Sequence, residues 1–302
     1  MQQVCHAYLY GGLFCVWGRF LLIIKELCCT ITVCLYRNGD FVMRIVVKVG
    51  TSTLAHAGGR LNIRRVELLC KVLSDLKNAE CQVVLVTSGA IGMGVGKLGL
   101  AGRPEDMPGK QAAAAVGQCE LMYTYDKLFA EYNHTVAQIL LTADDIQDVN
   151  RSRYVKDTLE RLLQWNALPI INENDAVAVD EIGVHTTIGE NDTLSAIVAK
   201  LVDADMLVLL SDIDGLYTAD PRVDPNATLI PTVEAITPEI MALAGGTGSS
   251  LGSGGMATKL KAASIATDAG IDMIIANGDD PESLYALLEG KPIGTRFVGK
   301  KD

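Results

Sequence analysis

The sequence predicts an α/β fold: a single three-layer αβα sandwich with a mainly parallel central sheet. From Met43 onward, short runs rich in β-branched residues alternate with longer stretches that have helical apolar spacing. The strand candidates are almost continuously apolar, as expected for parallel strands covered by helices on both faces. Neither a Pro- or Ser-rich linker nor an internal repeat divides this region. One domain is therefore the simplest account.

The individual elements follow from the same two patterns. Residues 44–49 form an apolar run that ends at Gly50, and residues 63–79 carry apolar side chains at helical spacing. Residues 83–86 form a second apolar run, closed by small and polar residues. The remaining expected strands are 136–141, 168–171, 206–210 and 273–276, and the remaining expected helices are 109–132, 154–165, 191–202, 256–269 and 281–288.

The first 42 residues differ from the rest in composition. They hold five of the eight cysteines, namely Cys5, Cys15, Cys28, Cys29 and Cys34. Arg19, Lys25 and Glu26 interrupt the apolar stretch, which argues against a secretory signal and against a spanning helix of about 20 residues. We expect 1–42 to be a leader outside the functional domain, such as a translated upstream region, and 43–302 to be the domain. A membrane- or organelle-targeting leader is the alternative.

Charge and cysteine usage narrow the class of partner. The chain has a net charge of −10, and residues 43–302 alone carry −11, with no long Lys/Arg cluster. This argues against nucleic acid as a partner, and we expect no membrane association. The body's Cys70, Cys81 and Cys119 lack metal-ligand spacing, which indicates a reducing compartment and a cytoplasmic location. The four histidines lie far apart, so neither a zinc site nor a histidine base is indicated.

Polar residues follow most of the expected strands, where ligands bind in parallel α/β sheets. Lys48 is the unusual one, because it lies inside an otherwise apolar strand and requires a counter-charge, for which we expect a phosphate. Ser88 follows the second strand without a hydrolase-type nucleophile motif, so we expect it to hydrogen-bond a polar ligand. Gly94–Gly99 matches a dinucleotide fingerprint as a string, but we interpret it as a flexible loop and a chance match.

Two further segments indicate ligand binding. The stretch Gly252–Lys259 places glycines before a helix whose first N–H groups can meet a phosphate, and Lys259 lies within its first turns. The acidic-amide clusters 172–175 and 189–192 are typical of solvated loops, but one follows a strand and the other opens a helix. Such a pair can grip an amino group or position cations.

Several sequence blocks, in order along the body, resemble the glutamate 5-kinase family of the amino-acid kinase superfamily. The blocks are 47–52, 86–91, 171–177, 189–192, 214–222 and 254–259. The resemblance implies the amino-acid kinase fold and ATP-dependent phosphorylation of the γ-carboxylate of L-glutamate, the first step of proline biosynthesis. Many relatives continue into a C-terminal PUA domain, and the family pattern here ends before one, so we expect no PUA domain.

The resemblance also implies site residues. Lys48, Lys259 and Asp192 resemble the catalytic residues, with Asp192 holding the two lysines in place. Ser88, Asp175 and Asn191 resemble the glutamate-binding residues. The ATP-binding residues implied are Lys48, Ser211, Asp212, Ser253, Gly254, Gly255, Met256, Ala257, Thr258 and Lys259. Magnesium is expected to arrive with ATP, and no residue is assigned to it.

The partners implied are L-glutamate, ATP, further copies of the chain in a homo-oligomer, and functional coupling to a glutamate-5-semialdehyde dehydrogenase. Two alternatives stay open. Another carboxylate or carbamate kinase of the same fold shares the phosphate apparatus, and a non-catalytic nucleotide-sensing module shares the binding site. The presence of both lysines and Asp192 argues against the second alternative.

Overall fold

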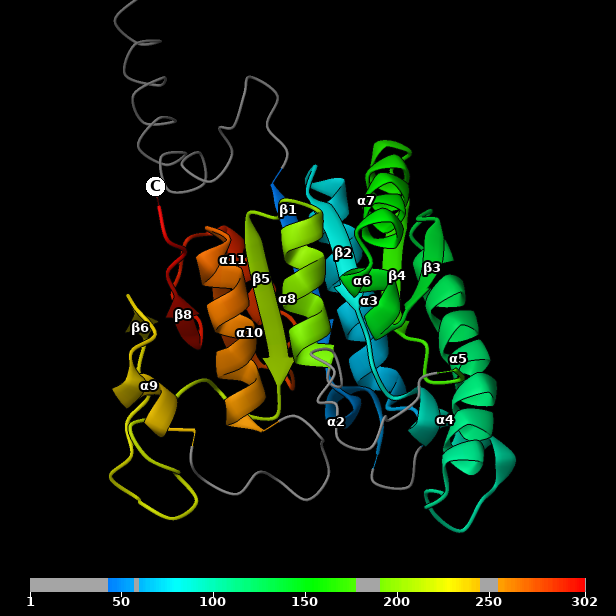
Figure 1. Cartoon of the computed structure of the whole chain (residues 1–302), viewed down its shortest axis with the longest axis horizontal. Coiled ribbons are helices and arrows are strands. Elements are labelled where there is room, and N and C mark those ends of the chain that lie inside the picture. Colours follow the sequence, from blue (N-terminus) through cyan, green and yellow to red (C-terminus); the bar gives the residue numbers. More distant parts are fainter. Residues whose placement is uncertain (1–42, 57–59, 178–190, 245–254, 302) are drawn as a thin grey trace, which may run out of the picture.

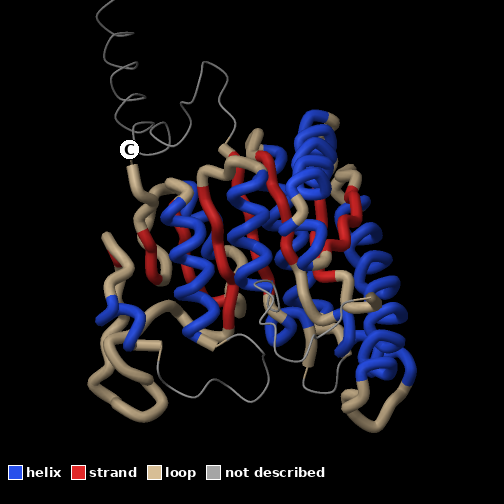
Figure 2. Tube along the Cα trace, in the orientation of Figure 1, coloured by secondary structure: helices blue, strands red, loops and turns tan. Residues whose placement is uncertain are grey.

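A computed structural model describes residues 43–56, 60–177, 191–244 and 255–301 of the chain. Within this part, helices flank a central sheet on both faces, as the sequence predicts (Figures 1 and 2). The strands are β1 (Arg44–Val49), β2 (Gln82–Val86), β3 (Val136–Leu141), β4 (Leu168–Glu173), β5 (Met206–Ser211), β6 (Thr232–Val233), β7 (Asp272–Asn277) and β8 (Thr295–Phe297). The helices are α2 (Thr51–Leu54), α3 (Ile63–Asn78), α4 (Ala90–Leu98), α5 (Met107–Ala130), α6 (Ala143–Gln147), α7 (Val149–Gln164), α8 (Asn191–Leu201), α9 (Pro238–Ala242), α10 (Met256–Asp268) and α11 (Ser283–Leu288).

The strand order of the described sheet is β3-β4-β2-β1-β5-β7-β8-β6. All neighbouring pairs are parallel except β7 and β8, which are antiparallel. The chain moves to one side of β1 to form β2, β3 and β4, and to the other side to form β5 and β7. In such sheets, ligands bind beyond the carboxyl ends of the strands where the order reverses. The topology therefore directs attention to the carboxyl ends of β1 and β5.

Two apolar cores cover the two faces of the sheet, and β1 contributes to both in alternation. Ile45, Val47 and Val49 pack in the core formed with α3 and α5, whereas Val46 packs in the core formed with α7, α8 and α10. Because side chains alternate along a strand, Lys48 projects to the same face as Val46. In Figure 1, α8 and α10 lie side by side on this face. The alternation of side chains along β1 therefore directs Lys48 toward α8 and α10.

The structure corrects the interpretation of Gly94–Gly99 as a flexible loop. Residues 94–98 are the second half of α4, and Gly99 ends that helix in a left-handed conformation. A Cβ atom on Gly94 would lie 1.8 Å from the Ala113 carbonyl oxygen. The glycines therefore lower helix propensity but let α4 and α5 approach backbone to backbone. Sequence spacing also did not predict α2, α6, α9, β6 and β8.

Helix and strand bounds otherwise agree with the expected ones to within a few residues, with α7 beginning earlier, at Val149. Residues 1–42, which the sequence predicts to be a leader, lie outside the described residues. None of the helices in the described part of the chain combines the length and apolar character needed to cross a membrane.

Candidate active site

The centre of the site is a buried carboxylate that contacts two lysines. Lys48 Nζ lies 2.5 Å from Asp192 Oδ1, and Lys259 Nζ donates a hydrogen bond to Asp192 Oδ2 over 3.1 Å. The three side chains come from β1, from the first turn of α8 and from α10. All three residues are at most 9% exposed. The structure therefore brings together Lys48, Asp192 and Lys259, which sequence analysis places far apart in the chain.

The counter-charge of Lys48 is thus a carboxylate of the chain itself. Lys48 meets Oδ1 as an ion pair and not through a well-directed hydrogen bond, since that oxygen has no hydrogen-bond partner of acceptable geometry among the described residues. Two cations and one anion leave this buried group with an excess positive charge. Burying such charge is costly unless an anion joins it. Such an arrangement can accept a phosphate, but the counter-charge that the structure itself gives Lys48 is Asp192, where the sequence analysis expects a phosphate.

The pKa of Asp192 reflects the same balance. Burial raises the pKa, but the nearby Lys48 and Lys259 lower it more, so the pKa lies below its ordinary value. A depressed carboxyl pKa means that ionisation stabilises the folded protein above the unfolded-state pKa, near 4. This stabilisation is lost as the pH falls through the folded-state pKa.

We expect the difference in unfolding free energy between wild type and Asp192→Asn to shrink as the pH falls from about 5 toward 2. The reason is that acid protonates the wild-type carboxyl and makes it neutral, as the amide already is. Urea unfolding across this pH range measures the difference. Asp203→Asn is the control, because Asp203 pairs with Lys156 at the surface with 68% of its side chain exposed. A difference for Asp192→Asn that stays constant over this range would contradict the expectation.

The beginning of α10 adds backbone donors next to this group. Gly255 precedes the helix without a side-chain cap, so the first N–H groups of α10 remain for other acceptors. Thr258 Oγ1 lies 2.8 Å from the Gly255 carbonyl oxygen and 3.1 Å from Asp192 Oδ2, so its hydroxyl ties α10 to α8. Ser253 and Gly254, also expected to bind ATP, lie outside the described residues.

A cavity of about 490 Å³ opens beside Lys259. The cavity is lined by the segment that follows β5, between Asp212 and Arg222, and by Gly255, Met256 and Lys259. At the carboxyl end of β5, Ser211 Oγ donates a hydrogen bond to Asp212 Oδ1 over 3.1 Å. Apolar side chains such as Leu216 and Leu243 line the cavity together with these polar groups. A cleft that is lined by apolar side chains, by Lys259 and by the first residues of α10 is suited to a nucleotide.

Three cavity residues have no site role in the sequence analysis, namely Asp214, Tyr217 and Asn277. Asn277 Nδ2 donates to Asp214 Oδ1 over 2.7 Å, and Tyr217 Oη donates to Asp214 Oδ2 over 2.9 Å. These two hydrogen bonds lower the pKa of Asp214. Asp214 and Tyr217 belong to a family block, and Asn277 ends β7, so the rule that ligands meet strand ends would have found it.

The expected substrate residues lie at the carboxyl ends of β2 and β4 and at the start of α8. Ser88 Oγ donates to the Val49 carbonyl oxygen over 3.1 Å and accepts from Thr51 Oγ1, next to the strand that carries Lys48. Asp175 lies in the turn after β4. Asn191 Nδ2 donates to Asn172 Oδ1 over 3.1 Å. Asn191 directly precedes Asp192, so the expected substrate and phosphate groups converge at the start of α8.

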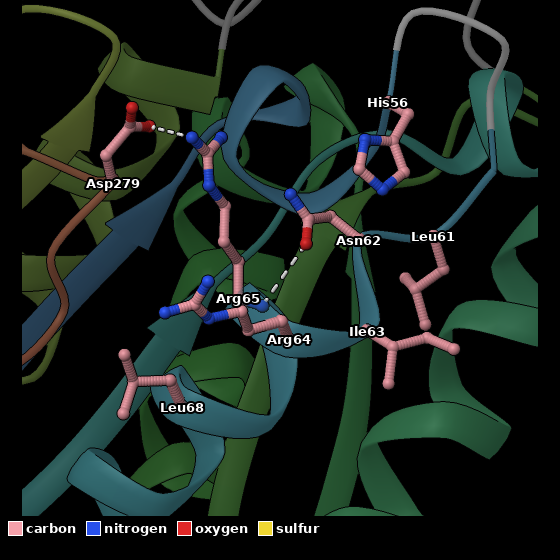
Figure 3. Close-up of a pocket in the computed structure, with 8 residues that line it drawn as sticks. All are labelled: His56, Leu61, Asn62, Ile63, Arg64, Arg65, Leu68 and Asp279. Carbon is pink, nitrogen blue, oxygen red and sulfur yellow. Dashed lines mark hydrogen bonds and ion pairs between the residues drawn. The ribbon is translucent and has the colours of Figure 1, made fainter.

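A second cavity, of about 670 Å³, lies between the loop before α3, the first turns of that helix and Asp279. Arg65 pairs with Asp279 over 2.7 Å, and Asn62 Oδ1 accepts from the Arg65 backbone N–H, as Figure 3 shows. His56 and Arg64 also line this cavity. Neither Lys48, Lys259 nor Asp192 lines it, so we assign it no part in the chemistry.

The residues described contain no group of three or more His, Cys, Asp or Glu side chains that could hold a metal ion. We assign no residue and no step of the reaction to a metal.

Comparison with known proteins decides the family. Residues 43–277 match the amino acid kinase family. The chain belongs to this family. Among curated relatives, glutamate 5-kinase of Clostridium perfringens is 54% identical over 258 residues, which cover 85% of this chain and 96% of the relative. Glutamate 5-kinase of Clostridium tetani is 57% identical over 256 residues, 85% of this chain and 94% of the relative.

Two solved kinase structures agree with the architecture. Isopentenyl phosphate kinase of T. acidophilum, in a product complex, superposes with a TM-score of 0.58 at 18% identity and covers 84% of this chain and 100% of its own. A substrate complex of isopentenyl phosphate kinase gives 0.56 at 19% identity, with 84% and 99% covered. At 18–19% identity, this structural likeness confirms the predicted α/β fold but does not indicate which substrate the chain binds.

Proposed function

We propose that this chain transfers the γ-phosphoryl group of ATP to the γ-carboxylate of L-glutamate and forms L-glutamyl 5-phosphate, the first step of proline biosynthesis. The observation that carries the proposal is the identity of 54–57% to glutamate 5-kinases over nearly their whole length. The buried Lys48–Asp192–Lys259 group beside a nucleotide-sized cavity supplies the chemistry.

The reaction requires little from a base. A glutamate side chain has a pKa of about 4.3, so it is already ionised at neutral pH. One carboxylate oxygen attacks the γ-phosphorus, the bond from that phosphorus to the β,γ-bridging oxygen breaks, and ADP leaves with the electron pair. The obstacle is the approach of two anions, which fixed cations and N–H groups relieve.

Within this proposal, Lys48 and Lys259 flank the transferring group. At an effective dielectric of about 20, two unit charges 4 Å apart interact by about 4 kcal/mol. Asp192 holds the two ammonium groups before ATP arrives, so little reorganisation is needed. Ser211, Asp212 and the start of α10 bind the nucleotide, and Ser88, Asp175 and Asn191 bind glutamate. Magnesium would arrive with ATP and would offset the negative charge of its phosphates, and no described residue is assigned to it.

The test of substrate class is trapping with hydroxylamine, which converts an acyl phosphate to a hydroxamate. With ATP and magnesium, we expect hydroxamate from L-glutamate and none above background from L-aspartate, N-acetyl-L-glutamate or bicarbonate. Hydroxamate from aspartate or acetylglutamate but not from glutamate would identify a sister kinase of the same fold. ATP binding without product from any acid would support a nucleotide sensor.

Replacing either buried lysine tests its assigned role. Lys48→Ala and Lys259→Ala should each lower kcat about 100-fold or more, because each removes a cation from the developing charge. Lys261→Ala is the matched control, since this lysine is exposed two residues further along α10. Thermal unfolding checks that each variant is folded. Folded variants with wild-type kcat would refute the role of the lysines.

We also propose that residues 43–302 are sufficient for activity. Met43 is buried, and its carbonyl oxygen accepts from the Gln82 N–H over 2.9 Å, so a chain that starts at Met43 keeps the whole of β1 and its packing. A chain that starts at Met43 should show kcat and KM within about twofold of the full chain. Loss of activity in that shorter chain, measured by the same hydroxamate assay, would assign a task to residues 1–42.

The remaining proposals concern the surroundings of the protein. We propose a homo-oligomer, coupling to a glutamate-5-semialdehyde dehydrogenase that consumes the labile acyl phosphate, and a cytoplasmic location. Light scattering measures the first of these. A monomer at micromolar concentration would contradict it.

A further inference from the structure

Three amide side chains form a continuous chain past the carboxyl end of the sheet. Asn172 Nδ2 donates to Gln118 Oε1 over 2.8 Å, and Asn191 Nδ2 donates to Asn172 Oδ1 over 3.1 Å. Gln118 belongs to α5, Asn172 to β4, and Asn191 is the first residue of α8. Gln118 and Asn172 are buried, with 8% and 1% exposed. These three hydrogen-bonded amides thus connect α5, on one face of the sheet, to the start of α8 on the other face, where the expected substrate residue Asn191 lies.

One backbone N–H group fixes which end of each of these three amide side chains is the oxygen. The Glu173 N–H donates to Asn172 Oδ1 over 2.9 Å, and a backbone N–H can only donate. The Asn172 oxygen must therefore face Glu173, and its nitrogen must face Gln118. Gln118 then has to present Oε1, and Asn191 has to present Nδ2. The orientation of Asn191 follows from hydrogen-bond complementarity alone.

With the amides oriented in this way, one polar atom at each end of the three-amide series has no hydrogen-bond partner among the described residues. Gln118 Nε2 and Asn191 Oδ1 are buried and have no hydrogen-bond partner among the described residues. Buried polar atoms are normally satisfied, so an acceptor left without a donor at a substrate site indicates a donor on the ligand. Asn191 Oδ1 is such an acceptor, next to the Asp192 group. The α-ammonium group of an amino acid has N–H groups that can donate a hydrogen bond to this oxygen.

We propose that Gln118 is a positioning residue that acts through Asn172 to hold the Asn191 oxygen toward the α-ammonium group of the acceptor amino acid. This rests on the proposed function, and it adds a specificity determinant on α5. Without the Gln118 acceptor, Asn172 Nδ2 is buried without a partner, and only the Glu173 N–H still holds the Asn172 amide. The amide can then tilt, which weakens its hydrogen bond from Asn191 Nδ2 and lets Asn191 turn its nitrogen toward the ammonium. An amide nitrogen donates and cannot accept from the ammonium N–H groups.

The test compares L-glutamate with glutarate, which has the same carboxylates but no α-ammonium. Gln118→Met removes the acceptor at similar side-chain length. We expect it to raise KM for glutamate tenfold or more, to leave kcat and KM for ATP within threefold, and to lower the ratio of kcat/KM for glutamate over glutarate by at least tenfold. Gln118→Leu is a second variant without the acceptor, and thermal unfolding checks that both are folded.

Gln118→Glu keeps an oxygen toward Asn172 and should restore the glutamate preference to within threefold of wild type. A purely structural role of Gln118 would lower kcat for both acids together and leave their ratio unchanged. A wild-type ratio in folded Gln118→Met or Gln118→Leu would overturn the proposal. Wild-type protein without hydroxamate from glutamate would instead contradict the proposed function on which it rests.

Discussion

Asp192→Asn should lower kcat at least 100-fold and destabilise the fold by about 3 kcal/mol or more. The amide keeps the size of the carboxylate but leaves the buried Lys48 and Lys259 without their shared anion. Breaking a buried ion pair by removing one partner typically costs about 3–5 kcal/mol. The two ammonium groups then repel each other and move from the position in which they meet the phosphoryl group. Losing one such preorganised group typically lowers kcat about 10²–10³-fold.

Steady-state kinetics at saturating ATP and glutamate measure the first effect, and urea unfolding measures the second. Asp203→Asn again serves as the control, with both quantities near wild type. An Asp192→Asn protein that is folded and fully active would show that the carboxylate does not organise the lysines.

Gly117→Val should destabilise the protein by about 3 kcal/mol or more. A Cβ atom on Gly117 would lie 1.8 Å from the Ala90 carbonyl oxygen and 2.3 Å from the Gly94 nitrogen. Both atoms are backbone atoms of α4, so no side chain can move aside and the two helices must separate. Overpacking of a well-packed interface typically costs about 1–3 kcal/mol, and a forced helix shift lies at or beyond the upper end.

The matched control is Gly102→Ala, where a Cβ atom would meet nothing within 4 Å. Denaturant unfolding should place the control within about 0.5 kcal/mol of wild type. Gly117 directly precedes Gln118, so any Gly117 variant that remains folded should also show a raised KM for glutamate. Wild-type stability of Gly117→Val would contradict the close packing of α4 on α5.

The sequence predicts the parallel sheet, because strand and helix periods are strong local signals. The sequence does not predict α4, and the reason is physical. Gly94 and Gly96 lower helix propensity, and the packing on α5 that outweighs this cost is invisible without the partner helix. The same holds for β6 and β8, which are two and three residues long and form only as part of the sheet.

For the site, the sequence predicts that Lys48, a charge within an apolar strand, requires a partner. The sequence pattern does not predict which residue that partner is, because Asp192 reaches Lys48 only through the packing of α8 against β1. Only the family resemblance implies Asp192. The positioning role proposed for Gln118 had no sequence signal. A glutamine in a long helix is ordinary, and its role depends on an amide in β4 that the fold brings within 2.8 Å.

The central claim is that a glutamate carboxylate oxygen attacks the γ-phosphorus of ATP in this protein. L-Glutamate labelled with ¹⁸O in its γ-carboxylate tests it most directly, with hydroxylamine present to release phosphate by attack at the acyl carbon. We predict that the released phosphate carries one ¹⁸O atom from glutamate, in amounts equal to the γ-glutamyl hydroxamate and ADP formed. Unlabelled phosphate, formed without hydroxamate, would mean that water attacks ATP instead and would contradict the account.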